Sequence, residues 1–186
     1  MDALSYLSVL FSIIIGLTIT QILQGYRALL LARRRVSLHG PTLFWSAILL
    51  LVASQVWWSS FGLTHVHGWT FLNFSMLMLQ TILLYMMAGL VLPDMPAEAS
   101  IDLEAHYERE TTPFFLLFLA MLATSVTKDL LREGHLPDPE NLAFHGAFAL
   151  VAILALLVRR RWLHAVIAPL GLIGLLAYIG LLFARL

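Results

Sequence analysis

The amino-acid sequence predicts an all-α, polytopic membrane protein with six transmembrane helices and both termini outside. Of its 186 residues, 60% are hydrophobic and only 12% are charged, and the mean hydropathy is +0.87. Soluble domains contain roughly 45–50% apolar and about 25% charged residues. One membrane-spanning helix needs about 20 mostly apolar residues. Six spans therefore use most of this sequence, as a single six-helix domain with short connections.

The six apolar runs follow one another along the chain, and polar or helix-breaking residues bound each of them. The predicted spans cover residues 4–31, 43–63, 69–92, 113–131, 142–158 and 162–184. The breaks contain the arginines at 33–35, the loop at 65–68, the acidic stretch at 93–112, the Gly/Pro segment at 134–139 and the arginines at 159–161. The first run lacks a basic leader and a cleavage pattern, so we expect it to remain in the mature chain.

The segment before the fourth span predicts a separate amphipathic helix over residues 101–111, on the cytoplasmic face. Ser100 is its candidate cap, and its apolar side would rest on the bilayer surface or on other loops. Pairing of Glu104 or Glu108 with the arginine clusters explains an acidic segment on this face. Thr112 as N-cap and Pro113 as first helical residue would then begin the fourth span.

The distribution of positive charge predicts the orientation, because cytoplasmic loops retain lysine and arginine during insertion. Placing the loops after the first, third and fifth spans inside leaves only Lys128, Arg132 and Arg185 outside. Both termini then face out. The same arrangement puts all five tryptophans at the level of the lipid headgroups, where an indole is most stable. Trp45 and Trp162 are the inner ones, and Trp57, Trp58 and Trp69 are the outer ones.

Small and polar side chains recur at spacings of three or four along the first span, which places them in one stripe. The stripe consists of Ser5, Ser8, Ser12, Gly16, Thr20, Gln24 and Arg27. One interpretation is a face that lines a pore or a ligand cavity. The alternative is a packing surface, because small residues let helices approach closely and form interhelical hydrogen bonds of about 0.6 kcal/mol.

Four further amides lie within the first three spans: Gln21, Gln55, Asn73 and Gln80. An unpaired amide costs several kcal/mol in hydrocarbon, so we expect these groups to meet each other, backbone carbonyls or water. The candidate cavity-lining residues are therefore Ser8, Ser12, Thr20, Gln21, Gln24, Gln55, Asn73 and Gln80. The alternative is a packing network without a ligand.

Histidines on the outer side are candidate metal ligands. His65 and His67 share one loop, His135 lies in the next outer loop, and His145 lies about one turn into the fifth span. Imidazole suits zinc and copper, and a haem held between His145 and an outer histidine is a related alternative. A His-x-His pair in a loop lacks the fixed helical spacing of specific zinc motifs, so solvated loop histidines are the other interpretation.

Several short segments carry a resemblance. They are Trp57-Trp58 with Phe61, Trp69-Thr70-Phe71, Leu92-Pro93-Asp94 and the run Asp102-Leu103-Glu104-Ala105-His106-Tyr107. This pattern resembles a group of small uncharacterised bacterial polytopic inner-membrane proteins, over the second and third spans and the loop after them. The resemblance implies a multi-pass protein of the bacterial plasma (inner) membrane and no particular activity.

These observations predict an integral membrane protein with a polar intramembrane cavity, acting as a channel or transporter for a small solute or ion. Small-residue faces on the fifth and sixth spans predict packing surfaces, some of them between subunits of a homo-oligomer in the lipid bilayer. The alternatives are a haem- or metal-binding redox protein, and a non-catalytic subunit with a membrane-protein partner. The sequence lacks hydrolase, metalloprotease and phosphate-loop signatures and basic-aromatic arrays, which argues against an enzyme and against nucleic-acid binding. It indicates no particular cofactor.

Overall fold

The computed structural model describes residues 3–61, 69–94 and 100–182, with side chains from residue 8 onward. Within these ranges it contains six helices that are long and apolar enough to cross a membrane. They are α1 (Ala3–Leu31), α2 (Gly40–Ser59), α3 (Phe71–Val91), α4 (Leu103–Glu133), α5 (Pro139–Leu157) and α6 (Arg161–Leu182). The predicted all-helical, six-span fold is confirmed, and the orientation of the termini stays a prediction.

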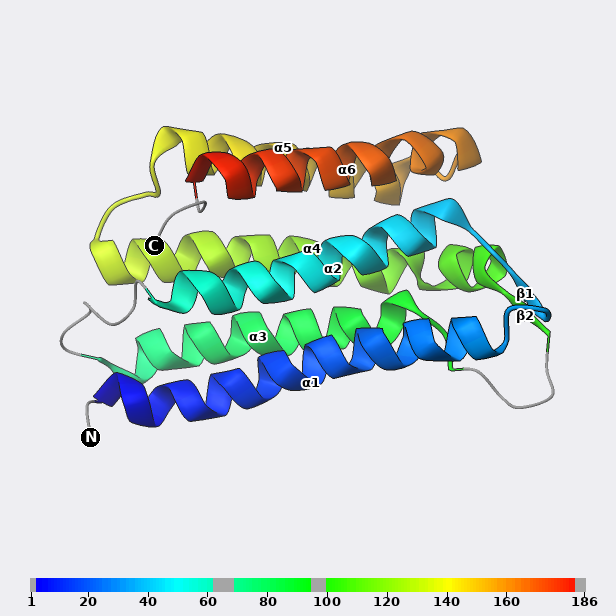
Figure 1. Ribbon diagram of the computed structural model, residues 1–186. Helices are drawn as coiled ribbons and strands as arrows, with labels where there is room; N and C mark the ends of the chain where they lie inside the picture. The colour runs from blue at the N-terminus through cyan, green and yellow to red at the C-terminus, as the bar shows by residue number, and fades with distance from the viewer. Residues whose placement is uncertain (1–2, 62–68, 95–99, 183–186) are drawn as a thin grey trace.

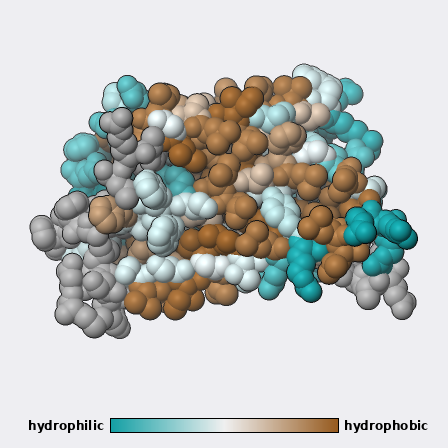
Figure 2. Space-filling view, viewed as in Figure 1, coloured by the Kyte–Doolittle hydropathy of each residue, from teal (hydrophilic) through white to brown (hydrophobic). Residues whose placement is uncertain are grey.

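The helices form three layers of two (Figure 1). α1 and α3 make one outer layer, α2 and α4 the middle layer, and α5 and α6 the other outer layer. α3 packs against α4 and α1, α2 packs against α6, and α5 packs against α4 and α6. Hydrophobic side chains dominate the middle of the bundle and polar ones gather at its two ends (Figure 2). In this arrangement α2 and α4 each have helices of both outer layers as neighbours.

The two ends of the bundle differ chemically. The connections after α1, α3 and α5 lie at one end (Figure 1), which carries the arginines of residues 33–35 and 159–161. We call it the arginine-rich end. α1 begins and α6 ends at the opposite end, the terminal end, where α2 and α4 also end. At the arginine-rich end, the parallel strands β1 (Val36–Ser37) and β2 (Ile101–Asp102) tie two of the connections together.

The amphipathic segment and the fourth span form one continuous helix, which differs from the expected pair of helices. α4 runs unbroken through Pro113, and its N-cap is Asp102 instead of Ser100. Thr112 lies inside this helix and does not cap it. A proline removes one backbone hydrogen bond, but transmembrane helices tolerate this where neighbouring groups satisfy the freed carbonyl. Because α4 packs against both α3 and α5, tertiary contacts override the break that the sequence suggested.

The N-cap of α4 should make the protein sensitive to acid. Asp102 Oδ1 accepts hydrogen bonds from the backbone N–H groups of Glu104 and Ala105 at 2.9 and 3.3 Å. These bonds lower the pKa of Asp102 from its usual 3.8, because they stabilise the carboxylate. The stabilisation is therefore present above pH 3.8 and is lost as the pH falls through the lowered value.

We expect Asp102→Ala to lower the thermal unfolding midpoint of the detergent-purified protein at pH 7. Asp102→Asn should keep most of the stability, because asparagine is also a good N-cap. Since asparagine does not titrate, that variant should lose less stability than the wild type when the pH is lowered below 3.8. Identical acid sensitivity of the wild type and Asp102→Asn would contradict the capping role.

Trp45 departs from the predicted belt of tryptophans at the headgroups. Its side chain is 1% exposed and packs edge-on against Phe115 with ring centroids 5.1 Å apart. Trp57, Trp58 and Trp162 are exposed, in agreement with positions facing lipid or water. The difference follows from the layering, because α2 lies at the centre of the bundle and presents Trp45 to α4.

A close approach of α1 to the end of α3 requires a glycine at position 25. A Cβ atom there would lie 2.5 Å from Leu92 Cδ1 and 3.1 Å from Leu92 Cβ. Because overpacking costs about 1–3 kcal/mol, we expect Gly25→Ala to lower the free energy of unfolding by about that amount. Gly16→Ala is the matched control on the same helix, since its Cβ would meet no atom within 4 Å. Equal stabilities of the two variants, measured by denaturant unfolding in detergent, would contradict the close contact.

Candidate functional site

A cavity of about 570 Å³ lies at the terminal end, among α2, α3, α4, α5 and α6. We call it the polar chamber. Its polar lining includes Gln55, Gln80, Ser125, Lys128, Asn141 and Tyr178. Small-molecule sites usually measure about 300–1,000 Å³, so the polar chamber is large enough for a ligand and not only for single waters.

A smaller pocket of about 70 Å³ adjoins the polar chamber. The two cavities share Gln55, Val56, Gln80, Ser125 and Tyr178 in their walls. The rest of the smaller pocket is mainly hydrophobic, with Ile48, Val52, Phe118, Met121, Leu122, Phe148 and Leu175 around it. We call it the apolar pocket. Together the two cavities form one site with a polar part and a hydrophobic part.

Charged residues form a network at the rim of the polar chamber. Asp129 lies between Lys128 and Arg132, at 3.6 and 3.3 Å, and Arg132 also pairs with Glu133 at 2.5 Å. The side chains of Lys128 and Asp129 are only 21% and 14% exposed. Asp138 lines the same chamber and is exposed. The rim therefore offers both signs of charge to anything that enters.

Gln80 carries the least satisfied polar atom of the chamber. The residue is 8% exposed, and its Oε1 atom has no hydrogen-bond partner among the described residues. Leaving a buried acceptor unpaired costs about 1–3 kcal/mol. This amide oxygen lies in the wall of the chamber and lacks a donor. It can therefore accept a hydrogen bond from a bound molecule or from water.

The structure brings together two of the amides that the sequence singled out. Gln55 and Gln80 line both the polar chamber and the apolar pocket. Asn73 is half-buried near the start of α3, where its backbone N–H donates to Thr70 Oγ1 at 3.2 Å. The other residues that line these cavities around Gln55 and Gln80 come mainly from α4, α5 and α6, and not from the first span as expected.

The polar stripe of α1 lies outside the chamber. Thr20 and Gln24 are exposed, and Ser8, Ser12 and Gln21 are half-buried. The side of α1 that packs into the bundle carries Phe11, Ile15, Thr18 and Ile22 instead. Figure 2 shows pale side chains along α1, low in the view, against the hydrophobic surface. The stripe therefore faces the surroundings of this chain, because α1 uses its apolar side to contact α3.

The candidate metal ligands do not gather in the part of the chain that the structure describes. His135 is exposed, and its Nδ1 atom lies 2.9 Å from the carbonyl oxygen of Leu136. His145 is buried in α5, with Nδ1 2.9 Å from the Asn141 carbonyl oxygen, and it lines the apolar pocket. His65 and His67 lie outside the described residues. Residues 3–61, 69–94 and 100–182 contain no group of three or more His, Asp or Glu suited to a metal ion.

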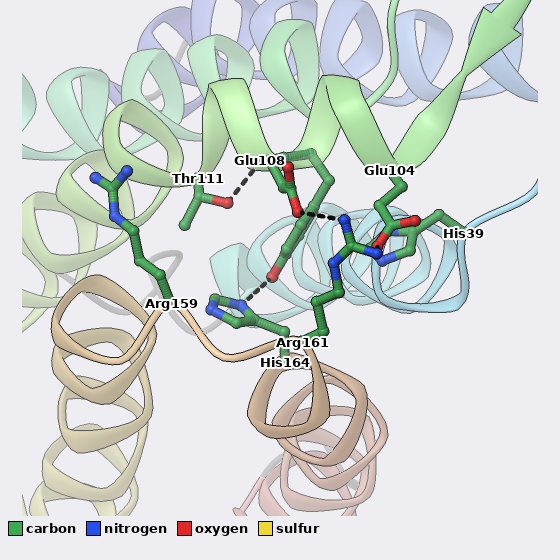
Figure 3. Close-up of a pocket in the computed structure, with 8 residues that line it drawn as sticks. His39, Glu104, Glu108, Thr111, Arg159, Arg161 and His164 are labelled. Carbon is green, nitrogen blue, oxygen red and sulfur yellow. Dashed lines mark hydrogen bonds and ion pairs between the residues drawn. The ribbon is translucent and has the colours of Figure 1, made fainter.

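A third cavity, of about 260 Å³, lies at the arginine-rich end (Figure 3). We call it the arginine-end pocket. Arg161 lies 3.1 Å from Glu104 and 3.3 Å from Glu108 across this pocket, so α6 is ion-paired to α4. Pairing of these two glutamates with an arginine cluster is what the sequence suggested. The pocket itself was missed, because its residues come from three segments that lie far apart in the sequence.

A tyrosine and two histidines complete the wall of the arginine-end pocket. Tyr107 Oη lies 2.8 Å from His164 Nδ1, and His164 Nε2 lies 3.2 Å from the Val158 carbonyl oxygen. A carbonyl only accepts, so Nε2 carries the hydrogen, and Tyr107 donates to Nδ1 of the neutral ring. Burial lowers the pKa of His39, although nearby carboxylates oppose the shift. Both imidazoles are thus suited to the neutral state near pH 7.

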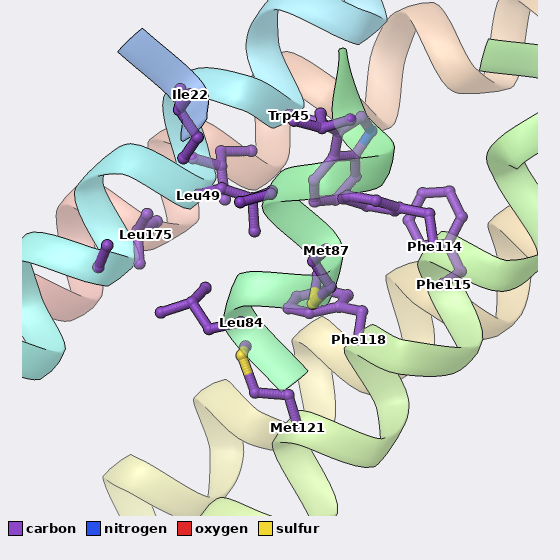
Figure 4. Close-up of a cluster of buried hydrophobic side chains, with 14 of the residues drawn as sticks. Ile22, Trp45, Leu49, Leu84, Met87, Phe114, Phe115, Phe118, Met121 and Leu175 are labelled. Atoms are coloured by element: carbon purple, nitrogen blue, oxygen red, sulfur yellow. The ribbon is translucent and has the colours of Figure 1, made fainter. Parts of the chain in front are cut away.

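Trp45 of α2 and three phenylalanines of α4 pack together inside the bundle (Figure 4). Trp45 packs edge-on against Phe114, Phe115 and Phe118, with ring centroids 5.8, 5.1 and 5.8 Å apart. We call these four residues the aromatic plug. Phe118 also lines the apolar pocket, and Phe115 lies beside His164 of the arginine-end pocket, with ring centroids 6.4 Å apart. The aromatic plug thus contacts the apolar pocket through Phe118 and the arginine-end pocket through Phe115.

Comparison with protein-family models, with curated proteins and with solved structures finds no match. The functional proposal therefore depends on the chemistry of the site alone.

Proposed function

We propose that this protein is a channel or transporter for a small solute, which binds in the polar chamber. The observation that carries the proposal is Gln80, whose buried Oε1 atom lacks a partner among the described residues and lies in the wall of a cavity of about 570 Å³. A polar guest that donates a hydrogen bond would satisfy this oxygen, at a net gain of about 0.5–1.5 kcal/mol for a neutral pair.

The order of the cavities supports translocation over simple binding. The aromatic plug contacts both the apolar pocket and the arginine-end pocket, so a rearrangement of its rings would be one part of opening a path between them. Channels and transporters close in this way, by hydrophobic constrictions or by rocking of helices around a central site. The solute would wait in the polar chamber until α2 and α4 separate.

The arginine clusters support an orientation for this proposal. Residues 33–35 and 159–161 lie at one end of the bundle, and positive residues stay in the cytoplasm. The polar chamber then opens to the outside of a bacterial plasma membrane, and the plug closes the inner side. The exposed Thr20 and Gln24 of α1 support a homo-oligomer, since small and polar residues promote helix association in lipid.

Osmotic swelling of proteoliposomes tests the function with a panel of chemically different solutes. Vesicles are mixed with isosmotic glycerol, urea, glycine or leucine, and light scattering follows solute entry. We expect at least one solute to enter faster than into protein-free vesicles, and Gln80→Leu to slow that entry roughly tenfold, the equivalent of about 1.4 kcal/mol.

The matched control is Gln21→Leu, the same change of an amide in a span. Gln21 is half-buried on α1 and lines neither the polar chamber nor the apolar pocket. Its variant should transport at the wild-type rate. Protein-free rates for all four solutes, or equal rates for Gln80→Leu and the wild type, would contradict the proposal.

A further inference from the structure

The site has two chemically different parts, and a ligand that fills it must have two parts as well. The polar chamber of about 570 Å³ is walled by charges and amides. The adjoining pocket of about 70 Å³ is walled mainly by hydrocarbon side chains such as Ile48, Val52 and Leu175. Burial of an apolar group gains about 25 cal/mol per Å². A polar head with a small hydrophobic side group satisfies both parts.

The surroundings of Lys128 favour a ligand with a negatively charged group. Its side chain is 21% exposed, and within the described residues its ion pair is with Asp129 at a long 3.6 Å. Asp129 also holds Arg132 at 3.3 Å, so one carboxylate is shared between two cations. An ammonium has three donors, and a carboxylate in the polar chamber would complete its partners with a charge-assisted hydrogen bond.

Hydrogen-bond acceptors in the walls of the polar chamber and the apolar pocket favour a ligand with a hydrogen-bond donor. Gln80 Oε1 has no partner among the described residues. Asp138 is the N-cap residue of α5, makes no side-chain capping hydrogen bond, and lines the chamber. His145 contributes to the apolar pocket, and because its Nδ1 faces the Asn141 carbonyl oxygen, Nε2 of the neutral ring is an acceptor. An ammonium group matches this set, since it donates and does not accept.

The charges around the polar chamber are of both signs, which suits a ligand that also carries both. The cations Lys128 and Arg132 face the carboxylates Asp129, Glu133 and Asp138 around the chamber. A lone anion would meet more carboxylates than cations. A lone cation would balance the excess carboxylate but would give Lys128 no further partner. A zwitterion places each of its charges beside the opposite one and adds no net charge to a partly buried site.

We infer that the solute is a small zwitterion of the α-amino-acid class with an aliphatic side chain. Its carboxylate would bind Lys128, its ammonium would bind Gln80 Oε1 and Asp138, and its side chain would enter the apolar pocket. The inference rests on the proposed function, because it names the class of solute for that same site.

Four probes that differ by one part each test the inference by calorimetric titration of the full chain in detergent. Leucine has all three parts. Isoamylamine lacks the carboxylate, 4-methylpentanoate lacks the ammonium, and glycine lacks the side chain. We expect leucine to bind at least tenfold more tightly than each of the others, because each loses one class of contact.

Variants connect each probe to a residue. Lys128→Met should reduce leucine affinity to that of isoamylamine and leave isoamylamine binding unchanged. Asp138→Asn, an exposed site where misfolding is not expected, should weaken leucine and isoamylamine but not 4-methylpentanoate. Arg27→Met, an exposed arginine that lines neither cavity, is the control and should change none of them.

The outcomes separate this inference from the function on which it rests. If isoamylamine or 4-methylpentanoate binds as tightly as leucine, the solute class is wrong while the chamber remains a binding site. If no probe binds but glycerol or urea swells the vesicles in a manner that depends on Gln80, the inference fails and the proposed function stands. If no probe binds and no solute swells the vesicles, both fail.

Discussion

Replacing Trp45 by alanine should lower the free energy of unfolding by about 3–5 kcal/mol, the range for truncating a buried aromatic side chain. The indole is 1% exposed and meets three phenylalanines edge-on at 5.1–5.8 Å. Such pairs add about 0.5–1.5 kcal/mol beyond the area that they bury. The same truncation removes the largest ring of the aromatic plug, so we also expect faster solute entry in the swelling assay.

Denaturant unfolding in detergent, followed by circular dichroism, measures the first effect without relying on indole fluorescence. Trp162→Ala is the matched control, because that side chain is 66% exposed and its loss should change the unfolding free energy little. A folded Trp45→Ala protein with wild-type swelling rates would show that the four rings are not the barrier. A stability loss equal to that of Trp162→Ala would contradict the packing itself.

The number and order of the helices could be predicted because the bilayer imposes a length of apolar sequence on every span. Runs of about 20 apolar residues, bounded by arginine clusters or by glycine and proline, allow few other structures. The expected bounds differ from the observed ones by a few residues at most ends. They fail clearly at α4, where a polar helical segment continues into the span without a break.

The polar chamber could be predicted only in part. The rule that buried amides need partners singled out Gln55 and Gln80, and the structure places both in one cavity. The same rule gave a wrong prediction for the polar residues of α1, because a membrane helix at the edge of a bundle buries only one side. Periodicity identified a stripe with Thr20 and Gln24, but it does not say whether that stripe or the side with Phe11 packs inward.

The neighbours of Gln55 and Gln80 depended on which helices lie at the centre of the bundle. Lys128 and Asp129 follow the apolar part of the fourth span, so the sequence alone indicates ordinary charges at the end of a helix. The structure places α4 beside α2 and α3, and both residues then line the polar chamber. Layer order arises from contacts between segments far apart in the sequence. Spacing within one segment carries no information about those contacts. The arginine-end pocket could not be predicted from the sequence for the same reason.

The second large effect concerns Asp129, whose replacement by asparagine should lower the free energy of unfolding by about 1.5–3 kcal/mol, the worth of hydrogen bonds to charged groups. Its carboxylate is 14% exposed and is shared by Lys128 and Arg132. Without it, two neighbouring cations lose their common counter-charge, and Lys128 has no other ion pair among the described residues. Arg132 retains Glu133, so the loss should centre on the lysine.

A double variant shows whether Lys128 is the source of that loss. Lys128→Met with Asp129→Asn removes the uncompensated charge, so it should be more stable than Asp129→Asn alone, with a coupling energy of about 0.5–3 kcal/mol.

Ligand binding separates the two variants further. Asp129→Asn leaves Lys128 free for a solute carboxylate, so leucine should raise its unfolding midpoint more than that of the wild type. The double variant, although more stable, should show no such shift. Additive effects of the two substitutions, or equal shifts with leucine, would mean that Asp129 and a bound carboxylate do not compete for Lys128.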